Sequence, residues 1–184
     1  MWVLLVLVVL VGLWVVSAYN GLVSLKNQTA NAFKQIDVQL KRRHDLIPNL
    51  VNAVKGAMDF EKSTLEAVVN ARNVAMKAEG VKQVSQAENA LSGALSRLLV
   101  TVERYPQLKA TGNIGQLQEE LASTENRIAF ARQLYNDTAT QYNTKQQQFP
   151  TTLVAGLAHA ERTDLWEIED QAERAVPQVD LSSR

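Results

Sequence analysis

The most apolar part of the chain is its N-terminus. Of the first 25 residues, 20 are apolar, and the first charged side chain is Lys26. A helix of about 20 apolar residues matches the roughly 30 Å hydrocarbon core of a bilayer. The pattern therefore predicts a transmembrane helix over residues 1–19, within an uncharged stretch that extends to residue 25. Trp2 and Tyr19 are expected to place their rings at the two membrane boundaries, with Trp14 deeper.

A cleaved signal peptide is the alternative for this segment, because Val16-Ser17-Ala18 fits a small-residue cleavage site. No basic residue precedes the apolar run, which favours an anchor over a signal peptide. All the nearby Lys and Arg residues follow the segment, so the positive-inside rule places the N-terminus outside and the rest of the chain in the cytoplasm. If the segment is cleaved, the protein is instead exported and soluble.

Residues 20–150 show the periodicity of amphipathic α-helices, with apolar side chains at steps of three and four. The steps form four series: Leu22, Leu25, Thr29, Phe33, Ile36 and Leu40; Leu50, Val54, Ala57, Leu65, Val68 and Ala75; Val84, Ala87, Leu91, Ala94, Leu98, Val102 and Tyr105; Ile114, Leu117, Leu121, Thr124, Ile128, Ala131, Tyr135, Thr138 and Tyr142. The fourth series keeps its steps over several heptads, which is typical of coiled-coil packing.

The boundary between the first and second series lies near Pro48. Asp45 is a candidate N-cap, with Pro48 in the first turn of a new helix, where its missing N–H costs little. One long helix kinked at Pro48 is the alternative. The basic run Lys41-Arg42-Arg43-His44 just before it is interpreted as a solvated helix end whose cations complement the helix dipole. Gly80 is expected to end the second helix.

The expected fold class is all-α: the transmembrane helix is followed by an elongated antiparallel four-helix bundle over residues 20–150, in up-down-up-down order. The fourth helix then returns towards the membrane. This places residues 151–184 at the membrane-proximal end, beginning with the apolar run from Leu153 to Leu157. That run either caps the bundle, which is favoured, or lies on lipid headgroups. The acidic remainder is interpreted as a flexible tail or a partner-binding segment.

Charge and cysteine content exclude several functions. The chain has no cysteine, so it has no disulfide, no thiolate nucleophile and no Cys-ligated zinc. Its 19 basic and 19 acidic residues give a net charge of zero, which argues against nucleic acid as a partner. The net charge is zero because a basic N-terminal part and an acidic C-terminal part cancel. Residues 1–45 carry five basic and two acidic groups, whereas residues 151–184 carry three basic and seven acidic groups.

Candidate chemistry is sparse, and neither an enzyme activity nor a cofactor or metal is expected. The two histidines, His44 and His159, have no acidic residue three positions earlier, so the Glu-x-x-His pattern of di-iron bundles is absent. Four charged residues fall on or beside the apolar series: Glu61, Arg72, Glu125 and Arg132. They are interpreted as buried groups that fix helix register, and a proton or ligand site is the less favoured alternative.

Tyrosine and asparagine recur as a pair. Tyr135-Asn136 and Tyr142-Asn143 lie one heptad apart, and Tyr19-Asn20 begins the first helix of the body. Because the tyrosines occupy positions of the apolar series, core packing is the favoured interpretation. A contact with a lipid headgroup at the membrane-proximal end, together with Leu153 and Leu157, is the alternative.

Several stretches resemble the bacterial LemA family. They are IDVQLKRRHDLIPNLV from Ile36 to Val51, ERYPQLKA from Glu103 to Ala110, LQEEL from Leu117 to Leu121 and ENRIAFAR from Glu125 to Arg132, followed by the two Tyr-Asn pairs and Phe149-Pro150. His44 departs from the family pattern, in which a tyrosine is expected in many members. The resemblance implies a single-pass protein of the bacterial inner membrane with an outside N-terminus and a cytoplasmic helical bundle. It implies no activity, and no residue points to the family branch associated with magnetosome membranes.

These observations favour a non-enzymatic scaffold or adaptor tethered to the membrane. Its expected partners are the lipid bilayer and unidentified proteins, and self-association is a further expectation because the heptad series can extend between subunits. The alternative, of a different class, is a module that binds lipid or a small molecule at the membrane-proximal end of the bundle.

Overall fold

A computed structural model describes residues 1–57, 62–105 and 112–167 of the 184-residue chain. Over these residues the protein is helical apart from short turns and one extended C-terminal segment. The helices are α1 (Trp2–Ala57), α2 (Lys62–Ala75), α3 (Gly80–Glu103), α5 (Gly112–Gln147) and the single turn α6 (Thr152–Ala155). The predicted all-α fold is confirmed.

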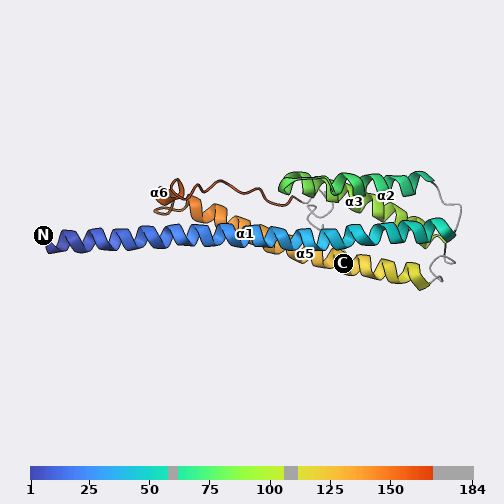
Figure 1. Cartoon of the computed structure of the whole chain (residues 1–184), viewed down its shortest axis with the longest axis horizontal. Helices are drawn as coiled ribbons and strands as arrows, with labels where there is room; N and C mark the ends of the chain where they lie inside the picture. Colours follow the sequence, from blue (N-terminus) through green and yellow to red (C-terminus); the bar gives the residue numbers. More distant parts are fainter. Residues whose placement is uncertain (58–61, 106–111, 168–184) are drawn as a thin grey trace, which may run out of the picture.

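Helix α1 contains 56 residues, which corresponds to about 84 Å at 1.5 Å per residue. Its apolar N-terminal third projects alone beyond the other helices (Figure 1). The large apolar side chains of this part are exposed, as Leu4, Leu7 and Leu10 illustrate. By length and composition, α1 is the one described helix that could cross a membrane.

Pro48 lies inside α1, so the prediction that a new helix begins at Asp45 is wrong. The alternative of one continuous helix is the observed arrangement. Proline has no N–H, and it leaves the carbonyl of the residue four positions earlier without its helical donor. That residue is His44, and its carbonyl accepts a hydrogen bond of 2.7 Å from Nε of Arg72 on α2. A side chain from a neighbouring helix thus replaces the missing backbone bond.

The four long helices run up, down, up and down, as predicted (Figure 1). The C-terminal half of α1, the α2–α3 hairpin and the N-terminal half of α5 enclose the larger core. Its fully buried members include Ile47 and Leu50 of α1, Val68 of α2, and Leu91 and Leu98 of α3. The hairpin is shorter than α1 and α5, so only the half of the bundle farther from the N-terminus has four helices.

The C-terminal half of α5 packs along α1 on its way back towards the N-terminal segment. Ile36 and Leu40 of α1 and Ile128 and Tyr135 of α5 form a second core. The ring centroid of Tyr135 lies 5.6 Å from that of Phe33, in a tilted arrangement.

Beyond α5 the chain makes the turn α6 and then reverses direction. His159 adopts a positive φ of 43°, and the N–H of Ala160 donates to the carbonyl of Ala155, so the turn closes as a left-handed cap would close a helix. Residues 160–167, which we call the strap, then run in extended form along the bundle towards the start of α3 (Figure 1). From the sequence, this acidic segment is interpreted as a flexible tail or a partner-binding segment; its described part, residues 160–167, contacts the bundle, whereas residues 168–184 lie outside the described residues.

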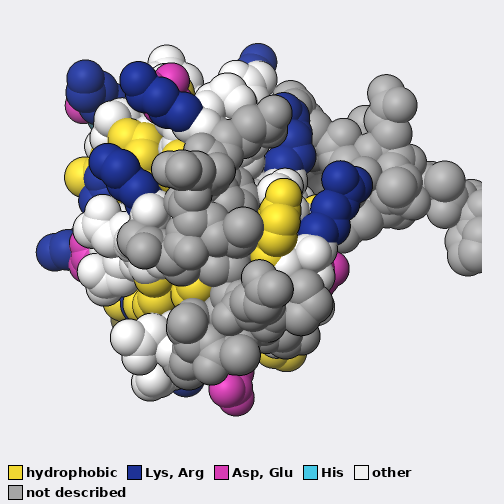
Figure 2. All heavy atoms as spheres, turned by 90° about the vertical axis from the view of Figure 1, so that its right-hand side faces the viewer, with side chains coloured by type: hydrophobic (Ala, Val, Ile, Leu, Met, Phe, Trp, Pro, Cys, Tyr) yellow, Lys and Arg dark blue, Asp and Glu magenta, His cyan; other side chains and the backbone are white. Residues whose placement is uncertain are grey.

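Viewed along the bundle axis from the end opposite the N-terminal segment, Lys and Arg side chains form separate groups around the rim (Figure 2). Asp and Glu side chains lie among them, and apolar side chains show between the charged ones. The described side chains on this face thus present both signs of charge rather than one basic patch.

Candidate functional site

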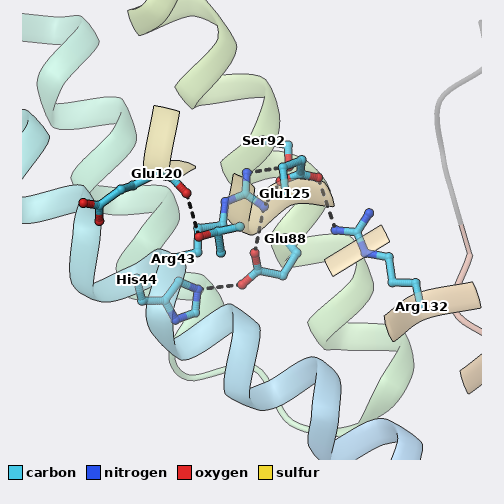
Figure 3. A network of polar contacts seen from close by, with 8 residues as sticks. Arg43, His44, Glu88, Ser92, Glu120, Glu125 and Arg132 are labelled. Carbon is cyan, nitrogen blue, oxygen red and sulfur yellow. Dashed lines mark hydrogen bonds and ion pairs between the residues drawn. The ribbon is translucent and has the colours of Figure 1, made fainter. Parts of the chain in front are cut away.

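A cluster of polar side chains, three of them buried, lies where α1, α3 and α5 meet (Figure 3). Arg43 and His44 come from α1, Glu88 and Ser92 from α3, and Glu125 from α5. Arg43 is 4% exposed, His44 8% and Glu88 0%, so three ionisable groups lie inside the bundle. We call these five residues the polar cluster.

Glu88 is the centre of the polar cluster, and both of its carboxylate oxygens have partners. Nε2 of His44 lies 2.6 Å from Oε1, and Nη1 of Arg43 lies 3.5 Å from Oε2. Arg43 also donates through Nη2 to Ser92 Oγ at 2.8 Å and pairs with Glu125 at 3.0 Å. A single guanidinium therefore joins three helices.

The polar cluster is suited to fixing the positions of α1, α3 and α5 relative to one another. A buried carboxylate is tolerated only when charges and hydrogen bonds compensate for its lost hydration, and Glu88 has both. Its two oxygens are already engaged by this chain. Among residues 1–57, 62–105 and 112–167, no group of three His, Cys, Asp or Glu side chains could hold a metal ion.

The structure places the charged residues singled out in the sequence as follows. Arg72 is half-buried and donates to the His44 carbonyl. Glu125 and Arg132 face each other along α5 at 3.9 Å, and the side chain of Glu125 is 44% exposed. The guanidinium of Arg132 also lies over the ring of Trp166 at 5.1 Å. Glu61 lies outside the described residues.

Two members of the polar cluster were interpreted differently from the sequence. The run from Lys41 to His44 was expected to be a solvated helix end, and this prediction is wrong because α1 continues to Ala57 and both Arg43 and His44 are buried. Glu88 was missed. A signal existed, since Val84, Glu88 and Leu91 continue to Leu95, Leu98 and Val102 in alternating steps of four and three, which puts Glu88 on the inner face.

An exposed apolar groove runs between α1 and α5. It is lined by Gln35, Val38, Gln39, Arg127, Phe130, Ala131 and Leu134 and has a volume of about 350 Å³. Phe130 is 73% exposed and Val38 64%, although both lie in the helical body rather than in the apolar N-terminal segment. We call this surface the apolar groove.

Three residues of the two Tyr-Asn pairs bind the strap: Tyr135, Asn136 and Asn143. The rings of Tyr135 and Tyr142 are buried, and the Tyr135 hydroxyl donates to the carbonyl of Asp164 at 2.6 Å. Burial and the nearby Asp164 raise the pKa of Tyr135 to about 12. Phe33, which contacts Tyr135, is 14 residues beyond Tyr19, or about 21 Å along α1. Tyr135 is therefore well away from the end of the predicted anchor.

Near the C-terminal end of α5, the turn α6 packs against α1 and α5. Val154 faces inward and is buried, whereas Leu153 is 67% and Leu157 69% exposed. Phe149, just before α6, is also exposed. On α1, the rings proposed as anchors differ in exposure: Trp2 and Tyr19 are exposed and Trp14 is half-buried.

These features define the class of protein: an elongated antiparallel helical bundle built onto one long helix whose apolar end could span a membrane. The profile of the LemA family matches residues 32–181, which is most of the chain. The chain therefore belongs to the LemA family, as the sequence resemblance indicated.

Individual relatives are distant. Protein LemA from Metamycoplasma hominis is 26% identical over 168 residues, which cover 89% of this chain and 73% of that protein. Magnetosome protein MamQ 2 from Paramagnetospirillum magneticum is 23% identical over 175 residues, covering 81% of this chain and 64% of the relative. Magnetosome protein MamQ from Magnetospirillum gryphiswaldense is 24% identical, with 79% and 63% covered. The chain thus spans just under two thirds of the length of these MamQ proteins.

Proposed function

We propose that this protein is a non-enzymatic scaffold tethered to the bacterial cell membrane, with its N-terminus outside and its bundle in the cytoplasm. The orientation follows from the Lys and Arg residues that begin at Lys26, immediately after the apolar segment. Because α1 runs without interruption from that segment into the bundle, the membrane anchor and the bundle share one helix. A partner bound to the bundle is then held at a fixed height above the membrane.

The observation that carries the proposal is the apolar groove between α1 and α5. Exposed apolar side chains that gather on a soluble surface mark interaction sites, and Phe130, Val38 and Leu134 gather here. The groove lies between two antiparallel helices, α1 and α5, an arrangement that is suited to the apolar face of a third helix. Arg127 at the rim favours an acidic residue on the partner.

The position of the groove restricts the partner. Val38 lies 19 residues beyond Tyr19, which corresponds to about 28 Å along α1. At that distance the groove is beyond the headgroup region. The proposed partner is therefore an amphipathic helix in the cytoplasmic part of another protein, and not a lipid.

The test is cross-linking in the native cell from a photoreactive amino acid at Gln35, which lines the apolar groove. The expected result is a cross-linked protein that disappears in Phe130→Ser and Val38→Ser variants. The control variant is Val100→Ser, which alters an exposed valine on α3 away from the groove. Cross-links that persist in both groove variants, or cross-links only to a second copy of this chain, would contradict the proposed partner.

A second candidate function is lipid contact by α6. It is favoured by the exposure of Leu153 and Leu157, on a turn that packs beside α1 at the membrane-proximal end. Because the chain lacks cysteine, single-cysteine labelling is direct. A fluorophore at Leu157→Cys in nanodiscs should be quenched by nitroxide-labelled lipid, whereas one at Val100→Cys should not. Equal quenching at the two positions would eliminate lipid contact by α6.

A further inference from the structure

The strap contacts α3 and α5 and is bound mainly through its backbone. Asn143 accepts from the N–H of Thr163 at 2.9 Å and donates to the Thr163 carbonyl at 2.8 Å. Asn136 makes the same pair of bonds with Trp166, at 2.8 and 3.1 Å. Each asparagine amide therefore pairs with one strap residue as a neighbouring β-strand would.

The spacing of these pairs matches on the two sides. Asn136 and Asn143 are seven residues apart on α5, or about 10.5 Å along a helix. Thr163 and Trp166 are three residues apart in extended chain, or about 10 Å. One heptad of α5 thus corresponds to three residues of extended peptide. The repeat of Asn136 and Asn143 therefore matches the period of an extended backbone.

Two further bonds complete the backbone recognition. Tyr135 donates to the carbonyl of Asp164 at 2.6 Å, and Ser85 of α3 donates to the carbonyl of Glu167 at 2.7 Å. We call Ser85, Arg132, Tyr135, Asn136 and Asn143 the strap groove. Between the described residues, six hydrogen bonds join the strap groove to main-chain atoms of the strap, so these bonds do not depend on the side chains of the bound segment.

One side chain of the strap is buried. Trp166 is 2% exposed, packs into the second core and is stacked by the guanidinium of Arg132 at 5.1 Å. Its indole N–H is buried and has no hydrogen-bond partner among the described residues. The Trp166 ring is therefore held by packing and by the stacked guanidinium, and not by a hydrogen bond of its indole N–H to a described residue. An unsatisfied N–H also weakens the fit of the strap itself.

Charge restricts the ligand further. The strap carries Glu161, Asp164 and Glu167 against one arginine. Lys82 of α3 lines the same small cavity as Asp164 and Glu167, and Arg132 lies under the aromatic ring. Basic groups thus border the strap groove on both helices, which suits an acidic segment.

We propose that the strap groove is a peptide-binding site for an extended, acidic segment of a partner protein that carries an aromatic side chain, and that the strap occupies the site until such a segment displaces it. The strap is tethered, so it competes as an intramolecular ligand at high effective concentration. Weakening the strap should therefore expose the site to a peptide supplied in solution.

The experiment uses the full chain in nanodiscs and a fluorescent peptide with the sequence of residues 160–170, followed by fluorescence anisotropy. Trp166→Ala removes the buried ring of the strap, and Thr163→Pro removes the N–H that donates to Asn143. Either variant should bind the peptide at least about tenfold more tightly than the unaltered chain. Leu165→Ala, which alters an exposed strap side chain, is the matched control and should bind as weakly as the unaltered chain.

Adding Asn136→Ala to Trp166→Ala should abolish the gain in binding, and a peptide whose own tryptophan is replaced by alanine should not bind. Absence of peptide binding to both strap variants, with helix content unchanged by circular dichroism, would overturn the proposal. Binding that is insensitive to Asn136→Ala would also overturn it. Loss of helix content in both strap variants would show that the strap is a permanent part of the bundle. That result would also overturn the proposal.

Discussion

Because α1 continues through Pro48, we predict that Arg72 stabilises the bundle at this position. The carbonyl of His44 cannot receive a backbone N–H from Pro48, and Nε of Arg72 donates to it at 2.7 Å. Replacing Arg72 with methionine keeps most of the aliphatic packing of the side chain and removes the donor. The helix should then be left with an unsatisfied carbonyl opposite the proline, so the bundle should be less stable.

The magnitude follows from the type of bond. Hydrogen bonds that involve a charged group contribute about 1.5–3 kcal/mol when buried. Arg72 is half-buried, so water recovers part of this, and we expect Arg72→Met to lower the free energy of unfolding by about 1–2 kcal/mol. In a Pro48→Ala background the new N–H donates to the His44 carbonyl. The same substitution should then cost less than about 0.5 kcal/mol, because the carbonyl is already satisfied.

The assay is a double-mutant cycle in urea, with circular dichroism of the chain in nanodiscs as the readout. The coupling between positions 48 and 72 should be about 1 kcal/mol. Arg97→Met, at an exposed position on α3, is the control and should show no coupling to Pro48. An equal cost of Arg72→Met in both backgrounds would show that Arg72 stabilises the bundle by another route, and the explanation of the unbroken helix would fail.

Three further outcomes are expected. Glu88→Ala should lower the free energy of unfolding by about 3 kcal/mol or more, because it leaves Arg43 and His44 buried without their shared carboxylate; a urea titration measures this, and a loss below about 1 kcal/mol would contradict it. Deletion of residues 1–18 should give a helical protein that no longer sediments with membranes; continued sedimentation would point to a second contact such as Leu157. Tyr135 has its pKa raised from 10.0 to about 12 in the folded chain, so its contribution to stability should be complete below pH 10 and lost as the pH rises through about 12. Tyr135→Phe should remove this part of the alkaline loss in a pH series of urea titrations; an unchanged alkaline profile would exclude Tyr135 as its source.

The architecture could be predicted because the apolar residues that specify it recur periodically along the sequence. Apolar side chains at steps of three and four identify the buried face of each helix, and short connections between such helices leave few arrangements other than an antiparallel bundle. Leu91, Leu98 and Ile128 were placed in apolar series and are fully buried. The prediction of one long apolar helix at the N-terminus was equally direct, because it needed only the length of the segment and its lack of charge.

The helix boundary near Pro48 was not predictable in this way. A proline preceded by a candidate N-cap is a strong local signal for a helix start. The residue that overrides it, Arg72, is 24 positions away on another helix. A helix start predicted near Pro48 also implies that the preceding basic run ends a helix. This is why Arg43 and His44 were predicted to be exposed to solvent. Local rules fail at such positions because a tertiary contact supplies what the backbone lacks.

The strap was missed for a related reason. A bond between two side chains at least joins two complementary residue types, although the pairs of Glu88 with Arg43 and His44 also escaped prediction. In contrast, Arg72, Asn136, Asn143 and Ser85 bind main-chain atoms, which every residue has. The sequence then shows the polar side chain, but no residue type identifies the main-chain group that it binds. Asn136 and Asn143 were visible as a heptad repeat, yet nothing in residues 160–167 marks their partner except one tryptophan. Here, a polar side chain repeated at helical spacing, without a complementary residue type elsewhere, provides a site for the backbone of another segment. In this bundle that site lies on α5.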